Sequence, residues 1–241
     1  MNTAPILRSA LTVVLLGVLA VPWGLKAQQT GSSGFEAVCD NRPIARYLLD
    51  GELRKALPLR VGCETQALAN TNAPFAEPLL RNYYFSTAQI LIALGEFDSA
   101  REKIQKAKAI PTNQLILWQG VQETAEGYLI ERTGQPGEAE RFYRAQSRPS
   151  PDSLVRLGAL YLEQGRIQEA RKAIDDSLQA NRFNPAAYAI LGDILQNSDR
   201  AAALHSYREA LRLSEEVSTV VSLTYIEVGA RAKRGIARLG G

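Results

Sequence analysis

The side chains that could perform acid–base, nucleophilic or metal chemistry are few and dispersed in this sequence. His205 is the single histidine, and its place two residues after the apolar core position Ala203 predicts an exposed polar residue rather than a base. The acidic pairs Asp175–Asp176 and Glu215–Glu216 are adjacent, so on a helix their carboxylates point about 100° apart instead of converging. The sequence therefore predicts a protein that is not an enzyme, with no catalytic residue and no metal or cofactor site.

The two cysteines could form a disulfide. Cys39 and Cys63 both follow an apolar amino-terminal run, and export to an oxidising compartment would let such a pair join and persist. Closing a loop of about 25 residues would stabilise the fold by roughly 3 kcal/mol. The alternative is two unpaired thiols packed as small hydrophobic side chains. We expect the disulfide Cys39–Cys63.

Residues 1–27 have the composition of a targeting segment. Arg8 precedes an uncharged run, residues 9–25, that is rich in Leu, Val and Ala. Secretory signal peptides share this pattern, and the run is also nearly long enough to span a bilayer. We therefore expect an exported protein, in the periplasm or on the extracytoplasmic face of the membrane. Its first 27 residues would be cleaved as a signal peptide or retained as a membrane anchor, and residues 28–34 would form a flexible polar linker.

The clearest structural pattern lies in residues 151–184. Small and apolar residues follow the spacing of two helices joined by a glycine turn, at Leu154, Leu157, Gly158, Tyr161, Gly165, Ala170 and Ile174. This spacing resembles the tetratricopeptide repeat, in which a Trp-x2-Leu-Gly-x2-Tyr helix precedes an Ala-x3-Phe helix. The resemblance extends over roughly residues 78–213, with a second good repeat after Asn184 and two imperfect repeats before Pro151.

The resemblance implies an all-α fold, a curved right-handed solenoid of helical hairpins. A Gly-x4-Ala offset marks the turn into the second helix of each hairpin, at Gly51/Ala56, Gly95/Ala100, Gly134/Ala139 and Gly165/Ala170. Residues 35–77 are interpreted as a degenerate capping hairpin, whose second helix Pro58 is expected to interrupt. Residues 78–213 form the solenoid, and residues 214–241 a carboxy-terminal capping helix.

The tail is predicted to be one helix from Glu215 to Gly241 that covers the end of the solenoid. A stripe of apolar residues recurs there at helical spacing. Beyond Glu227 its charges are all basic, at Arg231, Lys233, Arg234 and Arg238. We interpret them as a solvated helix end that interacts favourably with the helix dipole, with contact to anionic lipid headgroups as the alternative.

The resemblance also implies a concave surface lined by the first helix of each hairpin. The family's lining positions define a candidate peptide groove in this sequence. Its residues are Asn82, Phe85, Gln89, Ile92, Thr124, Tyr128, Glu131, Arg132, Asp152, Val155, Leu162, Glu163, Asp193 and Gln196. The Lys and Asn of the family's carboxylate clamp do not occur together at the corresponding positions.

The expected function is a protein–protein interaction scaffold in a cell-envelope complex. Its partner would be another protein, whose peptide or helix binds in the groove, and residues 9–25 could associate with the membrane. A net charge of +3 over the whole chain gives no basic field for nucleic acid. The alternative is an accessory module that captures a small ligand or polysaccharide for an envelope enzyme system. An open groove would favour the scaffold, and a tight hydrophobic pocket with convergent polar groups would favour the accessory module.

Overall fold

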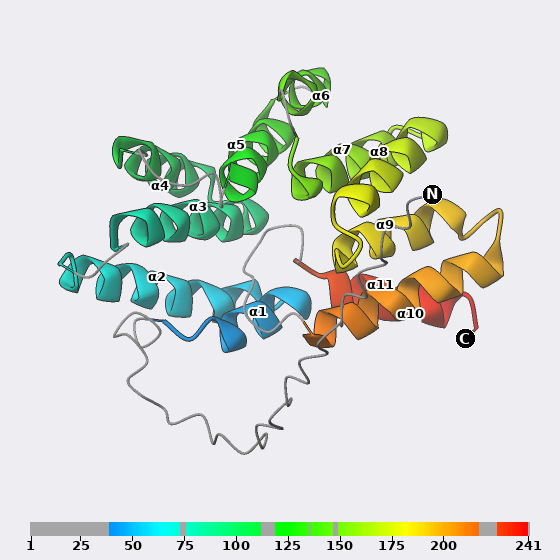
Figure 1. Ribbon diagram of the computed structural model, residues 1–241, viewed down its shortest axis with the longest axis horizontal. Coiled ribbons are helices and arrows are strands. Elements are labelled where there is room, and N and C mark those ends of the chain that lie inside the picture. Colours follow the sequence, from blue (N-terminus) through cyan, green and yellow to red (C-terminus); the bar gives the residue numbers. More distant parts are fainter. Residues whose placement is uncertain are drawn as a thin grey trace, which may run out of the picture. The chain divides into compact units, whose positions relative to one another are not determined.

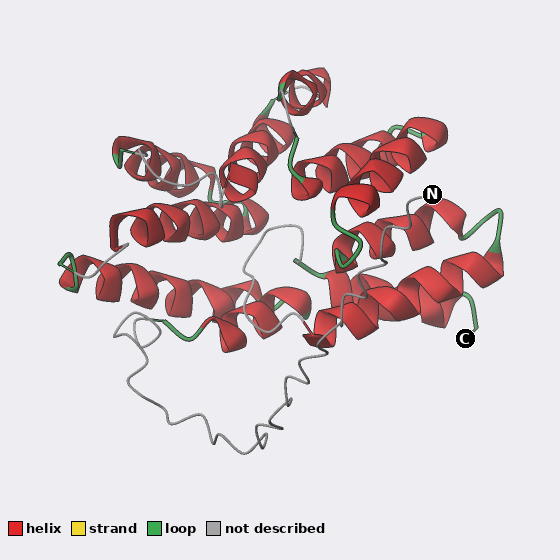
Figure 2. Cartoon of the chain, viewed as in Figure 1, coloured by secondary structure: helices red, strands yellow, loops and turns green. Residues whose placement is uncertain are grey.

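The protein is helical throughout the part that the structure describes. The structure is a computed structural model that describes residues 39–72, 76–111, 119–134, 136–146, 149–216 and 226–240. Within these ranges there are eleven α-helices and no strand (Figure 1; Figure 2). The helices are α1 Asn41–Leu49, α2 Leu53–Ala69, α3 Ala76–Leu94, α4 Phe97–Ala109, α5 Gln119–Thr133, α6 Pro136–Ala145, α7 Pro151–Glu163, α8 Ile167–Ala180, α9 Pro185–Leu195, α10 Arg200–Glu216 and α11 Val228–Arg238. The predicted all-helical solenoid is confirmed.

Successive helices pair into hairpins, α1 with α2 through α9 with α10, and each hairpin packs on the next. Glycine makes the tight turns, because Gly51, Gly95 and Gly165 adopt φ angles of +77°, +83° and +73°, a region that other residues enter only with strain. Each Gly-x4-Ala offset then places a small residue where the two helices approach closely. The four alanines at these positions have no exposed surface: Ala56, Ala100, Ala139 and Ala170.

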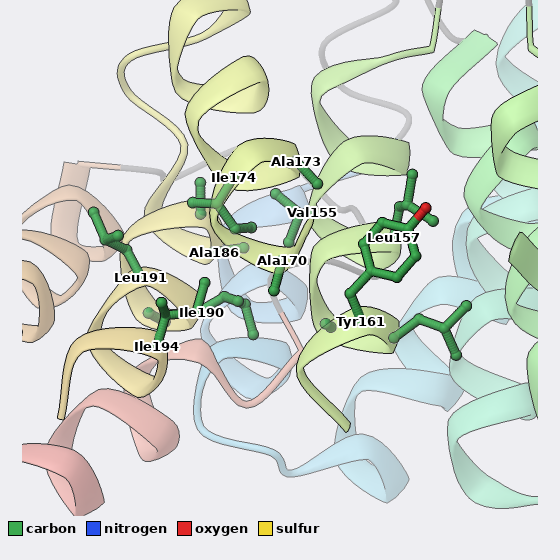
Figure 3. Close-up of a cluster of buried hydrophobic side chains, with 14 of the residues drawn as sticks. Val155, Leu157, Tyr161, Ala170, Ala173, Ile174, Ala186, Ile190, Leu191 and Ile194 are labelled. Carbon is green, nitrogen blue, oxygen red and sulfur yellow. The ribbon is translucent and has the colours of Figure 1, made fainter. Parts of the chain in front are cut away.

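A glycine of the first helix faces a large side chain of the second in three hairpins. A Cβ added to Gly158 would lie 2.7 Å from Ile174 Cδ1, so only glycine permits this approach. The pairs Gly127/Tyr143 and Gly192/Tyr207 repeat the arrangement. Ile174 and its neighbours belong to a cluster of buried apolar side chains that joins α7, α8 and α9 (Figure 3). The predicted glycine positions therefore set the spacing within the hairpins.

The amino-terminal hairpin is closed by the disulfide Cys39–Cys63, with the two Cα atoms 5.2 Å apart. The predicted pairing is confirmed. The prediction that Pro58 interrupts the second helix is wrong, because α2 continues from Leu53 to Ala69. Pro58 and Arg54 are both exposed. Water can therefore hydrogen-bond the Arg54 carbonyl that the proline leaves without an N–H donor.

The prediction of one continuous helix from Glu215 to Gly241 is wrong. Glu215 and Glu216 end α10, residues 226–227 form a turn, and α11 begins at Val228. Glu227 has a φ of 59°, a left-handed conformation that an α-helix does not contain. Most of the predicted apolar stripe, residues 217–225, lies outside the described residues.

The last helix, α11, closes the array of hairpins. It packs on α9 and α10, and it also contacts α1. Val228 and Ala232 of α11 are buried in the same apolar cluster as the central repeat. The predicted targeting segment, residues 1–27, and linker, residues 28–34, lie outside the described residues. None of the helices in the described ranges has the length and apolar character needed to cross a bilayer.

Candidate functional site

The inner side of the array contains a cavity of about 280 Å³, here called the inner cavity. Its walls come from α3, α5, α7 and α9, from the first residue of α2, and from the turn and first residues of α11. Ala93, Ala159 and Ala189 leave the space, because each is a small residue at a position that faces inward. A second cavity of about 470 Å³, between α7, α9 and α11, shares Ala159, Glu163 and Arg231 with the first.

The structure brings seven of the predicted groove residues to these two cavities. The inner cavity is lined by Tyr128, Arg132, Val155 and Glu163. The second cavity is lined by Leu162, Glu163, Asp193 and Gln196. Arg132 and Glu163 are exposed. Val155 is only 3% exposed, so it forms part of the cavity wall and its side chain does not project into solvent. The exposed charges on the inner cavity are therefore Arg132 and Glu163 on the predicted side, with Glu227 opposite them.

Four other predicted groove residues are buried between helices, so in this structure they are not available to a peptide. Phe85 and Ile92 belong to the apolar cluster that joins α3, α4 and α5. Gln89 Nε2 donates to Thr124 Oγ1 at 2.7 Å and to the Val121 carbonyl at 2.9 Å. The physical reason is that α3 and α5 pack through these positions, so the side chains hold the two hairpins together.

The remaining predicted residues, Asn82, Glu131 and Asp152, are partly buried and line neither cavity. Asp152 accepts a hydrogen bond from Asn184 Nδ2 at 3.1 Å, which joins α7 to the cap of α9. Glu131 forms an ion pair with Arg156, which joins α5 to α7. Asp152 and Glu131 therefore connect successive hairpins. The sequence pattern places them on the right helices without showing which neighbour they bind.

Arg156 is the centre of a largely buried polar group in the wall of the inner cavity. Its guanidinium lies 4.4 Å from the Tyr128 ring centroid, and Tyr143 donates its hydroxyl to Glu131 Oε2 at 3.3 Å. Burial raises the pKa of Glu131, because the charged carboxylate loses water. Burial is the largest influence on Arg156 and by itself would lower its pKa, but Glu131, Tyr143 and Tyr128 together outweigh it and the pKa is raised. The Glu131–Arg156 ion pair holds α5 against α7, which suits a rigid wall of the cavity.

Sequence reasoning missed the contribution of α11 to the site. Arg231 Nη1 lies 2.9 Å from Asp193 Oδ2, and Arg238 donates to Gln196 Oε1. The basic residues of the tail were interpreted as a solvated helix end or a lipid contact. The structure corrects this interpretation, because two of them bind the polar end of the predicted groove. Lys233 lies 3.7 Å from Asp50 and Arg234 lies 3.7 Å from Glu227.

The opposite charges of Arg231 and Asp193 were the feature of the sequence that could have predicted this pair. The sequence shows a basic tail and acidic groove positions, but not the distance between side chains 38 residues apart. Among the described residues, no group of three His, Cys, Asp or Glu side chains could hold a metal ion. His205 is exposed, as its position in the sequence predicted.

Comparison with known proteins agrees with this architecture. Residues 151–184, which form α7 and α8, match the family model of the tetratricopeptide repeat. The chain is also similar to the BBSome complex member bbs-4 of Caenorhabditis elegans, with 32% identity over 93 residues. That alignment covers 37% of this chain and 20% of the relative, so the chain spans about a fifth of the length of the relative it matches. The family match covers α7 and α8, so over this hairpin the chain is similar to tetratricopeptide repeats.

Proposed function

We propose that the protein is a non-catalytic scaffold that holds a short segment of another protein in its inner cavity. The observation that carries this proposal is the cavity itself, which the first helices of successive hairpins surround. Tyr128 supplies a partly buried aromatic face, and Arg132 and Glu163 supply exposed charges of opposite sign. An aromatic surface with flanking charges can fix both the position and the direction of a bound segment.

The proposed place of action is a complex of the cell envelope. The disulfide Cys39–Cys63 supports export, because disulfides persist in oxidising compartments and are rare where thiols are kept reduced. The apolar run of residues 9–25 supports the same proposal from the sequence. The relative in Caenorhabditis elegans is itself a member of a complex, which supports an assembly role for the similar hairpins.

A second candidate is an accessory module that binds a small ligand or a polysaccharide fragment. The last helix, α11, helps to enclose the inner cavity, and this enclosure favours the small-ligand candidate. A long peptide would instead need an open groove that runs the length of the array. The volume of about 280 Å³ lies near the lower end of the range for small-ligand pockets, about 300–1,000 Å³. The two candidates differ in whether the occupant is part of a macromolecule.

Site-specific photo-crosslinking in intact cells tests the proposal. A photoreactive phenylalanine analogue replaces Arg132 at the inner cavity, and in the control it replaces Ile167, an exposed residue at the start of α8 that lines neither cavity. We expect one discrete protein adduct from position 132, lost when Glu163 is changed to Lys, and none from position 167. The same adducts from both positions, or no protein adduct from 132, would refute binding in the cavity. Protease added to spheroplasts tests location, and full protection of residues 28–241 would refute export.

A further inference from the structure

The contact between α1 and α11 is the place where the first and last helices of the array meet, and we call it the seam. The Glu227 amide donates to the Leu48 carbonyl at 2.8 Å, and Lys233 lies 3.7 Å from Asp50. A Cβ added to Gly229 would lie 3.2 Å from the Leu49 carbonyl oxygen, so the two backbones approach closely. Ile226 is partly buried against the amino-terminal apolar cluster.

The ion pair at the seam is weaker than the one that joins α5 to α7. It is long, and the side chains of Lys233 and Asp50 are 67% and 43% exposed. By contrast, the Arg156 and Glu131 side chains that join α5 to α7 are 19% and 8% exposed. Exposed pairs contribute little because water and salt screen them, whereas breaking a buried pair leaves a charge without compensation.

The contacts on either side of the seam decide which parts would move. On one side, Arg231 binds Asp193, and the Tyr207 ring packs against Gly235, so α11 stays with α9 and α10. On the other side, the disulfide Cys39–Cys63 fastens the segment before α1 to α2. The array therefore has two firm ends that meet at the seam, which is held by one backbone hydrogen bond, an exposed ion pair and the packing of Leu49 and Ile226. Residues of the seam, Ile226 to Val228, also line the inner cavity.

We propose that the seam is the entrance to the inner cavity, and that the array opens between α1 and α11 to admit a partner segment and then closes around it. This inference rests on the proposed function for the identity of the occupant, but the opening itself is a property of the protein alone. A seam that closes again after binding restricts the occupant to a short piece of chain, such as a terminus or the tip of a loop. A long peptide that ran through the cavity would keep the seam open.

Thiol labelling inside the cavity tests the proposal without any partner. Ala93→Cys places a thiol on the wall of the inner cavity and not of the second cavity, and the native cysteines do not compete because they are joined to each other. The full chain is treated with iodoacetamide or with a maleimide carrying a polyethylene glycol chain of about 5 kDa. Gly229→Leu should wedge the seam apart, since its side chain meets the Leu49 backbone. Gly62→Leu is the matched control, because a Cβ on that helical glycine meets nothing within 4 Å.

We expect Gly229→Leu to speed labelling by the large reagent at least tenfold, with little change for iodoacetamide and no change in Gly62→Leu. A charge pair provides a second test that leaves the core intact. Lys233→Glu should speed labelling by the large reagent about two- to threefold, and Asp50→Lys in the same chain should restore the original rate. Equal rates in Gly229→Leu and Gly62→Leu, with no rescue by the charge swap, would overturn the proposal. So would equal access of both reagents to the unmodified cavity.

The labelling outcome is independent of the crosslinking outcome. If the seam controls access but no protein adduct forms at position 132, the entrance stands and the scaffold function fails. If a protein adduct forms while both seam variants label at the unmodified rate, the function stands and the entrance lies elsewhere.

Discussion

The amino-terminal hairpin and the central repeat have the same two-helix architecture but are stabilised differently. In the central repeat, α7 and α8 pack through Gly158 and Ile174, and Ser150 caps α7 by accepting a hydrogen bond from the Ser153 amide. In the amino-terminal hairpin, a disulfide fastens the chain, and α2 buries Arg60 and Glu64. A central hairpin buries apolar surface on two neighbours, whereas a terminal hairpin has fewer neighbours and needs other sources of stability.

The buried charges of α2 also fix how this hairpin sits on the next one. The Arg60 guanidinium donates to Asn41 Oδ1 at 2.9 Å and lies 4.9 Å from the Tyr83 ring centroid. Burial lowers the pKa of Arg60 to about 10, because the charged form loses water. Glu64 of the same helix binds Thr87 and Lys103 in the next hairpin. Such groups specify one arrangement more than they stabilise it, since apolar residues of similar size often stabilise as well or better.

The largest effect that separates the two regions is expected from Glu64→Ala. It would leave Lys103 without its buried partner and Thr87 without its acceptor, and it should lower the free energy of unfolding by about 3–5 kcal/mol. Denaturant unfolding followed by circular dichroism measures the change. The control is Glu52→Ala, which removes an exposed pair with Lys55 and should cost less than about 1 kcal/mol. Equal losses would show that the buried carboxylate has no special role.

Removal of the disulfide is expected to have the next largest effect. Cys39→Ser with Cys63→Ser should lower the free energy of unfolding by about 3 kcal/mol, because the unfolded chain gains conformational freedom. A reducing agent should reproduce this loss in the unmodified protein and leave the double variant unchanged. Two free thiols in the denatured, unreduced protein would contradict the pairing.

The central repeat should respond instead to overpacking. Gly158→Leu forces a side chain against Ile174 and should cost roughly 1–3 kcal/mol. Gln168→Leu, at an exposed position of α8, is the matched control and should be nearly silent. Thermal unfolding of the two variants measures the difference. If both variants melt alike, glycine is not needed at the crossing of α7 and α8.

The smallest effect concerns acid stability near the central repeat. The hydrogen bond from Arg166 lowers the pKa of Glu140 to about 2, although burial opposes it, and Arg144 and Tyr161 add to the lowering. The folded state therefore binds the proton more weakly than the unfolded state. The stabilisation is complete above the ordinary carboxyl pKa of 4.5 and is lost as the pH falls to about 2.

Glu140→Gln should accordingly lose less stability than the unmodified protein between pH 4.5 and about 2. Unfolding curves at several pH values measure this, with Glu138→Gln, an exposed carboxylate of the same helix, as the control. The same acid dependence in all three proteins would show that the Arg166 contact does not act on Glu140. Glu140→Gln should not change the stability of the amino-terminal hairpin over the same pH range, so this effect also distinguishes the two regions.

Apart from the course of α2 through Pro58 and the turn before α11, the sequence by itself determined the helices and the hairpin turns, and it favoured the disulfide. These features depend on local rules, namely the 3.6-residue spacing of apolar positions, the left-handed glycine turns at Gly51, Gly95 and Gly165, and a single pair of cysteines. The resemblance to the tetratricopeptide repeat placed the predicted groove residues on the first helix of each hairpin. Local rules also explain how α9 begins, because Asn184 caps the helix and Pro185 follows it.

Only the tertiary structure decided which of those groove residues are free to bind. Gln89 and Thr124 fall at groove positions, yet they are buried because α3 and α5 cross there. Two contacts depend on the rotation of each hairpin relative to the preceding one: the pairing of Asp193 with Arg231 and the contact between Leu48 and Glu227. That rotation accumulates over the whole array, and it is set by side-chain packing between hairpins rather than by the pattern within any one of them.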